Sequence, residues 1–109
     1  MDLTVSDVIA SRLHRHGVTH VFGVTGGACA YLTEAVERNP NLTFVPMLQE
    51  GSAVVAAEAY AQRKQGLGAV IVTSGPGSTN ALTGVTAAFF DSSPIVVIAG
   101  QVKTEDLRA

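Results

Sequence analysis

Four apolar runs rich in β-branched residues alternate with helix-type segments, and this alternation constrains the fold more than any other feature of the chain. The runs are 18–24, 42–48, 69–73 and 94–99. Each is nearly continuous in apolar residues, which is typical of strands covered on both faces. Helices alternating with such strands predict an α/β fold: a doubly wound, mostly parallel sheet with helices on both faces and right-handed crossovers. With 109 residues, we expect a single domain over 1–109.

The helix-type segments carry recognisable start and stop signals. Thr4 followed by Asp7 predicts an N-cap with an acid in the first turn, and Gly17 predicts the end of that helix. Further helices are expected over 28–38, 51–65 and 79–90. Gly66 and Gly68 are expected to end the helix over 51–65.

Composition and charge argue against several classes of function. The formal net charge is −2 and the basic residues are scattered, so we expect neither nucleic-acid nor membrane binding. The apolar runs are far shorter than the ~20 residues of a membrane span, and the N-terminus shows no signal-peptide pattern. Cys29 is the only cysteine, and His14 and His16 face different sides of a helix, so we expect no metal site. These features favour a cytoplasmic protein.

Three glycine-rich or polar segments each follow a strand directly: 25–27, 49–51 and 74–80. In an open parallel sheet the carboxyl ends of the strands lie at one edge, and ligands bind in the crevice beyond that edge. We therefore expect the three segments to lie close together there. Their convergence makes this edge the candidate ligand site.

The two glycine-containing loops do not identify the ligand by themselves. "GVTGGA" is not the dinucleotide-binding pattern G-x-G-x-x-G, because Thr25 stands in place of the second glycine. "SGPGSTN" lacks the lysine with which a P-loop binds phosphate. Taken singly, both loops are typical of tight strand-to-helix turns. A generic nucleotide-binding α/β domain therefore stays an alternative.

Glu50 is the carboxylate among these segments, and it precedes a helix made mostly of alanine and valine. An acid at a helix start ordinarily stabilises the helix through the macrodipole. This helix, however, is apolar on nearly every side, so we expect it to be buried on several sides and to pack against a partner chain. A carboxylate at its mouth is partly withdrawn from water, which favours a proton-sharing form and suits a proton relay.

Four ordered motifs point to a family: "HVFGVTGGA", "FVPMLQEGSAVVAAEAYA", "VIVTSGPGSTNALTGV" and "FFDSSPIVVIAGQV". Through them the chain, from about residue 4 to residue 107, resembles the N-terminal pyrimidine-binding (PYR) domain of thiamine-diphosphate-dependent enzymes, in the acetolactate synthase-like family. The resemblance implies the thiamine diphosphate-binding fold and a catalytic role for Glu50, which matches the glutamate of the family's H-E-Q motif. In the family this carboxylate hydrogen-bonds the cofactor's aminopyrimidine and favours the imino tautomer that deprotonates thiazolium C2. The ylide so formed attacks a 2-oxo acid.

The resemblance also implies which residues surround the cofactor. Besides Glu50, those expected near it are Thr25, Gly26, Gly27, Pro76 and Asn80. The chain departs from the family pattern beside the acid, where Gln49 replaces the histidine and Gly51 replaces the glutamine. Because the acid itself is retained, these departures bear on substrate choice and loop geometry more than on cofactor activation.

The family holds the diphosphate and its Mg²⁺ in a separate C-terminal domain, and some members carry FAD with a middle domain. The sequence shows neither domain, so the resemblance implies a fragment or one piece of a split enzyme, inactive alone. Its expected partner is a second copy, a higher homo-oligomer or a diphosphate-binding domain or subunit. The assembled enzyme is expected to decarboxylate a 2-oxo acid and transfer the resulting carbanion equivalent. A non-catalytic dimerisation or regulatory module related to such enzymes is the alternative.

Overall fold

The computed structural model describes residues 2–107, and its first helix begins where the sequence predicts. Helix α1 (Val5–Arg15) has Thr4 as its N-cap. The Thr4 hydroxyl accepts the N–H of Asp7 at 3.1 Å, and the Asp7 carboxylate accepts the N–H of Thr4 at 2.9 Å, which forms a reciprocal capping box. Gly17, with φ of +87°, follows the helix as predicted.

The four strands found in residues 2–107 form one parallel sheet in the order β2-β1-β3-β4. They are β1 (His20–Gly23), β2 (Thr43–Pro46), β3 (Gly68–Val72) and β4 (Ile95–Ala99). Val21 of β1 pairs with Phe44 on one side and with Ala69 on the other. The chain leaves β1 toward β2 and then returns to β3 on the opposite side, so the switch point lies between β1 and β3. The predicted doubly wound α/β fold is confirmed.

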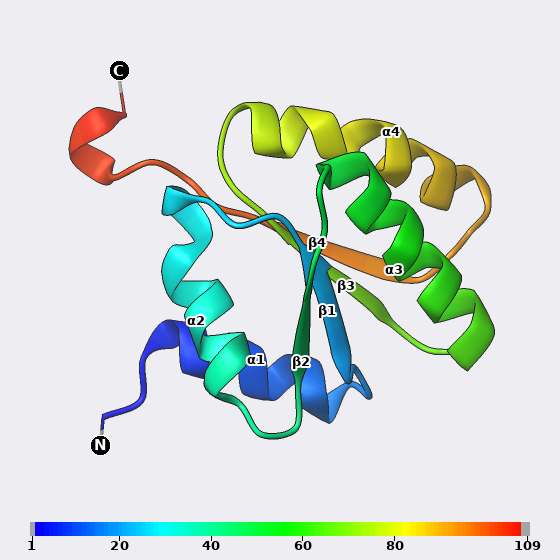
Figure 1. The fold of residues 1–109 in the computed structure, drawn as a ribbon, viewed down its shortest axis with the longest axis horizontal. Helices are drawn as coiled ribbons and strands as arrows, with labels where there is room; N and C mark the ends of the chain where they lie inside the picture. Colours follow the sequence, from blue (N-terminus) through cyan, green and yellow to red (C-terminus); the bar gives the residue numbers. More distant parts are fainter. Residues whose placement is uncertain (1, 108–109) are drawn as a thin grey trace.

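Two helices cover each face of the sheet (Figure 1). On one face lie α1 and α2 (Ala30–Arg38), the latter preceded by a short 3₁₀ turn, η1 (Gly27–Cys29). On the other lie α3 (Glu50–Lys64) and α4 (Pro76–Phe90). A second 3₁₀ turn, η2 (Thr104–Asp106), follows β4. The fully buried strand β3 supplies Ala69 and Ile71 to the α1/α2 core and Val70 and Val72 to the α3/α4 core, as the alternation of a strand requires.

Two helix boundaries differ from the sequence prediction. Helix α4 begins at Pro76 instead of Thr79, because proline at the first helical position needs no N–H partner and Gly75 adopts the φ of +61° that leads into it. Helix α3 is closed by Gln65 in the left-handed region, with φ of +56°, instead of by a glycine. Gly68 belongs to β3, where a side chain would collide with the backbone oxygen of Ala57.

Candidate functional site

Glu50 is the first residue of α3, at the carboxyl edge of the sheet. Gln49 caps the helix, because its side-chain oxygen accepts the N–H of Ser52 at 2.9 Å. The Glu50 carboxylate therefore lies at the positive end of the α3 macrodipole. Glu50 is half-buried, as expected from the apolar helix that follows it.

The carboxylate faces the first turns of α4. The Asn80 side-chain amide donates a hydrogen bond to Glu50 Oε1 at 3.3 Å. Gly77 lies on the other side, where a Cβ on this residue would be 3.9 Å from Glu50 Oε2. The second and third predicted segments thus meet at Glu50, one through Glu50 itself and the other through Asn80 and Gly77.

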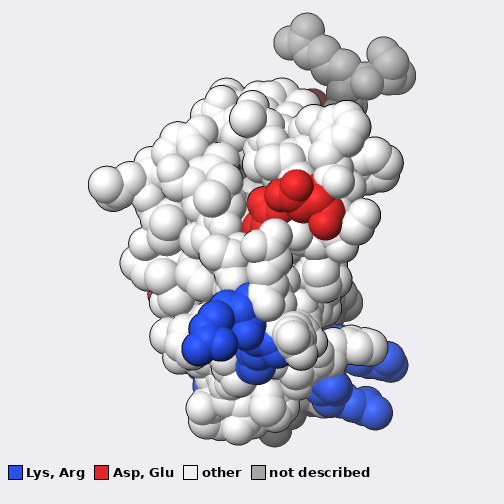
Figure 2. Space-filling model, turned by 90° about the vertical axis from the view of Figure 1, so that its right-hand side faces the viewer, with Lys and Arg blue, Asp and Glu red and all other residues white. Residues whose placement is uncertain are grey.

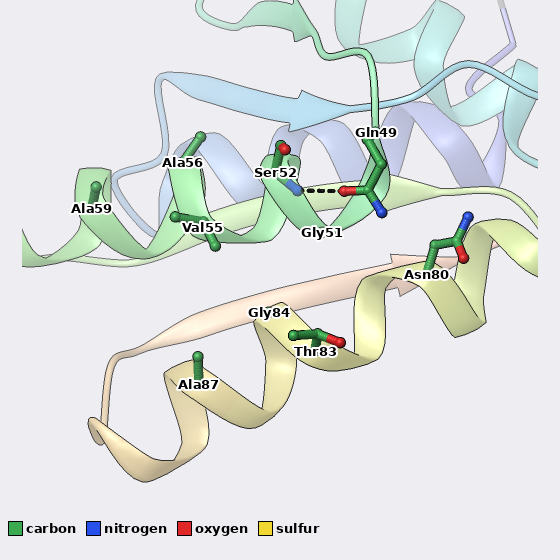
Figure 3. Close-up of a pocket in the computed structure, with 10 residues that line it drawn as sticks. All are labelled: Gln49, Gly51, Ser52, Val55, Ala56, Ala59, Asn80, Thr83, Gly84 and Ala87. Carbon is green, nitrogen blue, oxygen red and sulfur yellow. Dashed lines mark hydrogen bonds between the residues drawn. The ribbon is translucent and has the colours of Figure 1, made fainter.

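A groove of about 600 Å³ runs between α3 and α4 from this point (Figure 3). Gln49 and Asn80 lie at one end of it, and the rest of its lining is mostly small and uncharged: Gly51, Ser52, Val55, Ala56, Ala59, Thr83, Gly84 and Ala87. The helices approach closely at Gly84, where a Cβ would lie 2.6 Å from Val54 Cβ and 3.1 Å from the Gly51 oxygen. Val55 remains 54% exposed, so this face of α3 is unpartnered in the single chain.

A second cavity, of about 610 Å³, lies over the switch point between β1 and β3. Gly27, Thr73 and Ser74 line it together with residues of η1, α2 and the segment after β4. Lys103 and Asp106 bring opposite charges to the same rim. Gly27 of the first glycine loop lines this cavity, whereas Gln49 and Asn80, the neighbours of Glu50, line the end of the groove, so the predicted site residues are divided between two hollows.

The predicted site residues fall into two groups in the structure. Glu50 and Asn80 are in direct contact, and Gly26 packs against Thr73, which follows β3. Gly27 lines the second cavity. Thr25 and Pro76 are exposed, and no hydrogen bond within residues 2–107 joins either of them to Glu50.

Two residues that sequence reasoning passed over have structural roles near the site. Thr73 lies between the two glycine loops. Glu58, on α3, is buried with 7% of its surface exposed, and its Oε1 accepts hydrogen bonds from Ser93 Oγ at 2.9 Å and from Gln62 Nε2 at 3.3 Å. An acid inside an alanine-rich helix was a visible signal for Glu58, whereas nothing local marked Thr73.

Residues 2–107 contain no group of three or more metal-ligating side chains placed to hold a metal ion. No helix in the same range is long and apolar enough to cross a membrane.

Comparison with known proteins relates the chain to one family of cofactor-dependent enzymes. A family model described as "Thiamine pyrophosphate enzyme, N-terminal TPP binding domain" matches residues 3–108. Mitochondrial acetolactate synthase of Schizosaccharomyces pombe is 40% identical over 101 residues, which are 93% of this chain and 15% of that protein. The large subunit of Escherichia coli acetolactate synthase isozyme 3 is 39% identical over 102 residues, which are 94% of this chain and 18% of that protein.

A chloroplastic acetolactate synthase of Nicotiana tabacum is 44% identical over 97 residues, which are 89% of this chain and 15% of that protein. The chain therefore spans less than a fifth of the length of these relatives. The family match covers almost the whole chain, and its description names thiamine pyrophosphate as the bound group. The chain belongs to the N-terminal, thiamine pyrophosphate-binding domain family of thiamine pyrophosphate enzymes, with acetolactate synthases as its relatives.

Proposed function

We propose that the chain binds the aminopyrimidine ring of thiamine diphosphate and that Glu50 exchanges a proton with a nitrogen of that ring. The observation that carries this proposal is the position of the Glu50 carboxylate, half-buried between the first turns of α3 and α4. Asn80 occupies Oε1, and no hydrogen bond from residues 2–107 reaches Oε2. One carboxylate oxygen is thus held while the other is left for a ligand.

The residues around Glu50 fit a flat ring. Gly27 and Gly75, in the two glycine loops, have open space where a side chain would stand, so a ring can approach their backbone closely. The adjoining groove is lined mostly by apolar atoms of small residues, which suits a ring with few polar groups. The Gln49 and Asn80 amides at its end supply the few oriented donors and acceptors that fix such a ligand.

Glu50 acts in this proposal by holding and releasing a proton at Oε2. The carboxylate lies at the start of α3 and its Oε1 accepts a hydrogen bond from the Asn80 amide, so both helices hold it in place. A proton relay requires the carboxylate to be within hydrogen-bond reach of the ring nitrogen, and Oε2 is the oxygen left for that contact. When bound, thiamine diphosphate supplies an acidic thiazolium carbon and an electron sink for the decarboxylation of a 2-oxo acid.

We further propose that a second domain or chain completes the site and brings the diphosphate and Mg²⁺. The groove is continuous with the Glu50 site and open along α3 and α4, so a partner that covers the groove also closes the site. Exposed Val55, Leu82, Phe89 and Phe90 extend this uncharged surface. Figure 2 shows the side where the two helices end: most of it is neither acidic nor basic, with one acidic patch near the middle and basic side chains below it. The partner is a diphosphate-binding domain, in a homodimer or larger assembly. The location of the protein in the cytoplasm stays a prediction.

The proposal is tested with Glu50→Gln in the assembled enzyme, by the hydrogen–deuterium exchange of thiazolium C2 measured by NMR. We expect the exchange catalysed by the protein to fall by at least about 100-fold, because the amide cannot accept and return the proton. Glu34→Gln is the control, since Glu34 lies on α2, across the sheet, and its ion-pair partner within residues 2–107 is Arg38. Exchange at the native rate in Glu50→Gln contradicts the assigned role.

The exposed groove also favours the second candidate, a non-catalytic dimerisation or regulatory module. That function requires self-association or association with a longer relative but no affinity for thiamine diphosphate. Thiamine diphosphate and ATP are each titrated calorimetrically into the chain and into the assembled enzyme. The result distinguishes the proposed function, the non-catalytic module and a nucleotide-binding domain. Binding of thiamine diphosphate alone supports the proposed function, binding of ATP alone supports a nucleotide-binding domain, and association without either ligand supports the module.

A further inference from the structure

Thr73 is the residue that joins the two glycine loops. It follows β3 directly, at the switch point of the sheet. Its Oγ1 accepts the N–H of Ala28, in the 3₁₀ turn that follows the first glycine loop, at 3.2 Å. Its backbone oxygen accepts a hydrogen bond from the hydroxyl of Ser78, on α4, at 2.8 Å. One residue therefore contacts the segment before α2 and the first turn of α4.

The side chain of Thr73 also fills the space that two glycines leave empty. A Cβ on Gly26 would lie 2.5 Å from Thr73 Cβ, and a Cβ on Gly77 would lie 2.7 Å from Thr73 Cγ2. The same position on Gly77 is 3.9 Å from Glu50 Oε2. Gly26, Thr73, Gly77 and Glu50 thus form one continuous line of contacts through all three segments of the site.

The orientation of Thr73 is fixed by these contacts. Threonine is β-branched, so turning χ1 moves the hydroxyl and the methyl group together. A rotation that carried the methyl group away from Gly77 would also remove the hydroxyl from the N–H of Ala28. Oγ1 holds the first loop through the N–H of Ala28, whereas Cγ2 lies against both Gly26 and the first turn of α4 at Gly77.

We propose that Thr73 is a positioning residue that fixes the separation of the two glycine loops and thereby the approach of α4 to Glu50. The inference rests on the proposed function for the identity of the ligand, whereas the line of contacts belongs to the free chain. Within residues 2–107 Thr73 makes no hydrogen bond to Glu50, so we assign its effect to its contacts with Gly77 and Ala28. Its hydroxyl and its methyl group have separable tasks.

The methyl task is tested by thermal unfolding of the 109-residue chain with Gly77→Ala, Thr73→Ser and the double variant. Gly77→Ala is expected to lower Tm by about 5 °C, because the new Cβ collides with Cγ2. Thr73→Ser removes Cγ2, and the nearest Thr73 atom to the new Cβ is then at 3.5 Å. The double variant is therefore expected to unfold within about 2 °C of Thr73→Ser alone.

Two other glycines provide matched controls. Gly26→Ala collides with Thr73 Cβ, which serine retains, so Thr73→Ser is not expected to rescue it. Gly27→Ala meets no atom within 4 Å and is expected to change Tm by less than about 2 °C. If Thr73→Ser rescues Gly26→Ala as well, or fails to rescue Gly77→Ala, the contact line is not set by Cγ2 and the proposal is overturned.

The hydroxyl task is tested by amide hydrogen exchange at Ala28. Thr73→Val keeps the branched shape and loses the acceptor, so the exchange of this amide is expected to rise about fivefold, whereas Thr73→Ser keeps protection. In the assembled enzyme, C2 exchange is expected to fall about tenfold in Thr73→Val and to be largely retained in Thr73→Ser. Unchanged Ala28 protection in Thr73→Val refutes the positioning role. Loss of protection with C2 exchange unaffected by both Thr73→Val and Glu50→Gln refutes the proposed function instead.

Discussion

Glu50 and Glu58 lie about two turns apart on α3, one at each end of its contact with α4. Glu50 is half-buried, lies beside the end of the groove and receives one hydrogen bond, at 3.3 Å from Asn80. Glu58 is buried and receives two, from Ser93 and Gln62. The same residue type therefore has different roles at the two ends of one helix pair. Glu58 fastens α3 to the turn after α4, whereas Glu50 makes a single long hydrogen bond to the first turns of α4.

Neither Oε2 receives a hydrogen bond from residues 2–107, so the two acids differ in their burial and in how firmly Oε1 is held. Between the two ends, Gly84 lets α4 touch Val54 and Gly51. The helix pair is thus held by two hydrogen bonds at the Glu58 end, which we call the tied end, and is close-packed in the middle. At the Glu50 end, the loose end, one long hydrogen bond holds it. Such a gradient allows a ligand or partner to enter at Glu50 without disturbing the rest.

The largest stability effect is expected at the tied end. Glu58→Ala should lower the free energy of unfolding by about 2 kcal/mol, because it leaves a small cavity and removes the acceptor for Ser93 and Gln62. Glu50→Ala should cost less than about 1 kcal/mol, mostly the favourable helix-start charge. Urea unfolding of both variants measures the contrast. Equal losses would remove the distinction between the two ends.

A smaller loss is expected in the middle. Gly84→Ala should cost about 1–2 kcal/mol, because the collision with Val54 exceeds the gain in helix propensity. The added methyl group should also separate the helices and weaken the Asn80–Glu50 hydrogen bond. Gly66→Ala, which meets no atom within 4 Å, is the control. Both are compared by chemical denaturation, and a silent Gly84→Ala would show that the helices adjust freely.

At the loose end, Asn80→Ala should change the free energy of unfolding by less than about 0.5 kcal/mol, because its bond to Glu50 is long and exposed. Its effect on function should be larger than on stability, since Oε1 of Glu50 is then no longer held. C2 exchange in the assembled enzyme, beside a denaturation curve, measures both. A stability loss as large as that of Glu58→Ala would show that this end is tied as well.

Asp7 is a third carboxylate, on the surface, and we expect its substitution to have the smallest effect on stability. Hydrogen bonds from the Thr4 backbone and hydroxyl and then from Arg38 lower the pKa of Asp7 from 3.8 to about 2. A lowered folded-state pKa contributes stability that is complete above about pH 4 and is lost as the pH falls toward 2. Asp7→Asn should remove this acid-limb dependence, measured as Tm against pH. If Tm falls at low pH as much in Asp7→Asn as in the native chain, other carboxylates cause the loss of stability in acid.

The sequence supported the fold because its signals are local. Thr4, Asp7 and Gly17 mark α1 through contacts within one or two turns, and the apolar runs mark the strands. The meeting of Glu50 and Asn80 was also foreseeable, because parallel strands bring their carboxyl ends to one edge. The start of α4 was misplaced because proline favours both turns and first helical positions.

The remaining features depend on contacts between distant residues. Thr73 meets Gly26, and Glu58 meets Ser93, only after the sheet has formed, and neither pair has a local pattern. The division of the site into a groove and a second cavity likewise follows from how α3, α4 and the segment after β4 pack. A sequence pattern identifies the residues at an edge, whereas side-chain packing decides which of them touch.

The strand order has a consequence for folding while the chain is being synthesised on the ribosome. β1 lies inside the sheet, and Val21 bonds on one side to a strand that is synthesised much later, at Ala69. While Gly68–Val72 is still being translated, β1 has no strand on the edge that later pairs with β3. Nascent chains in that window are the ones most exposed to aggregation and most dependent on chaperones.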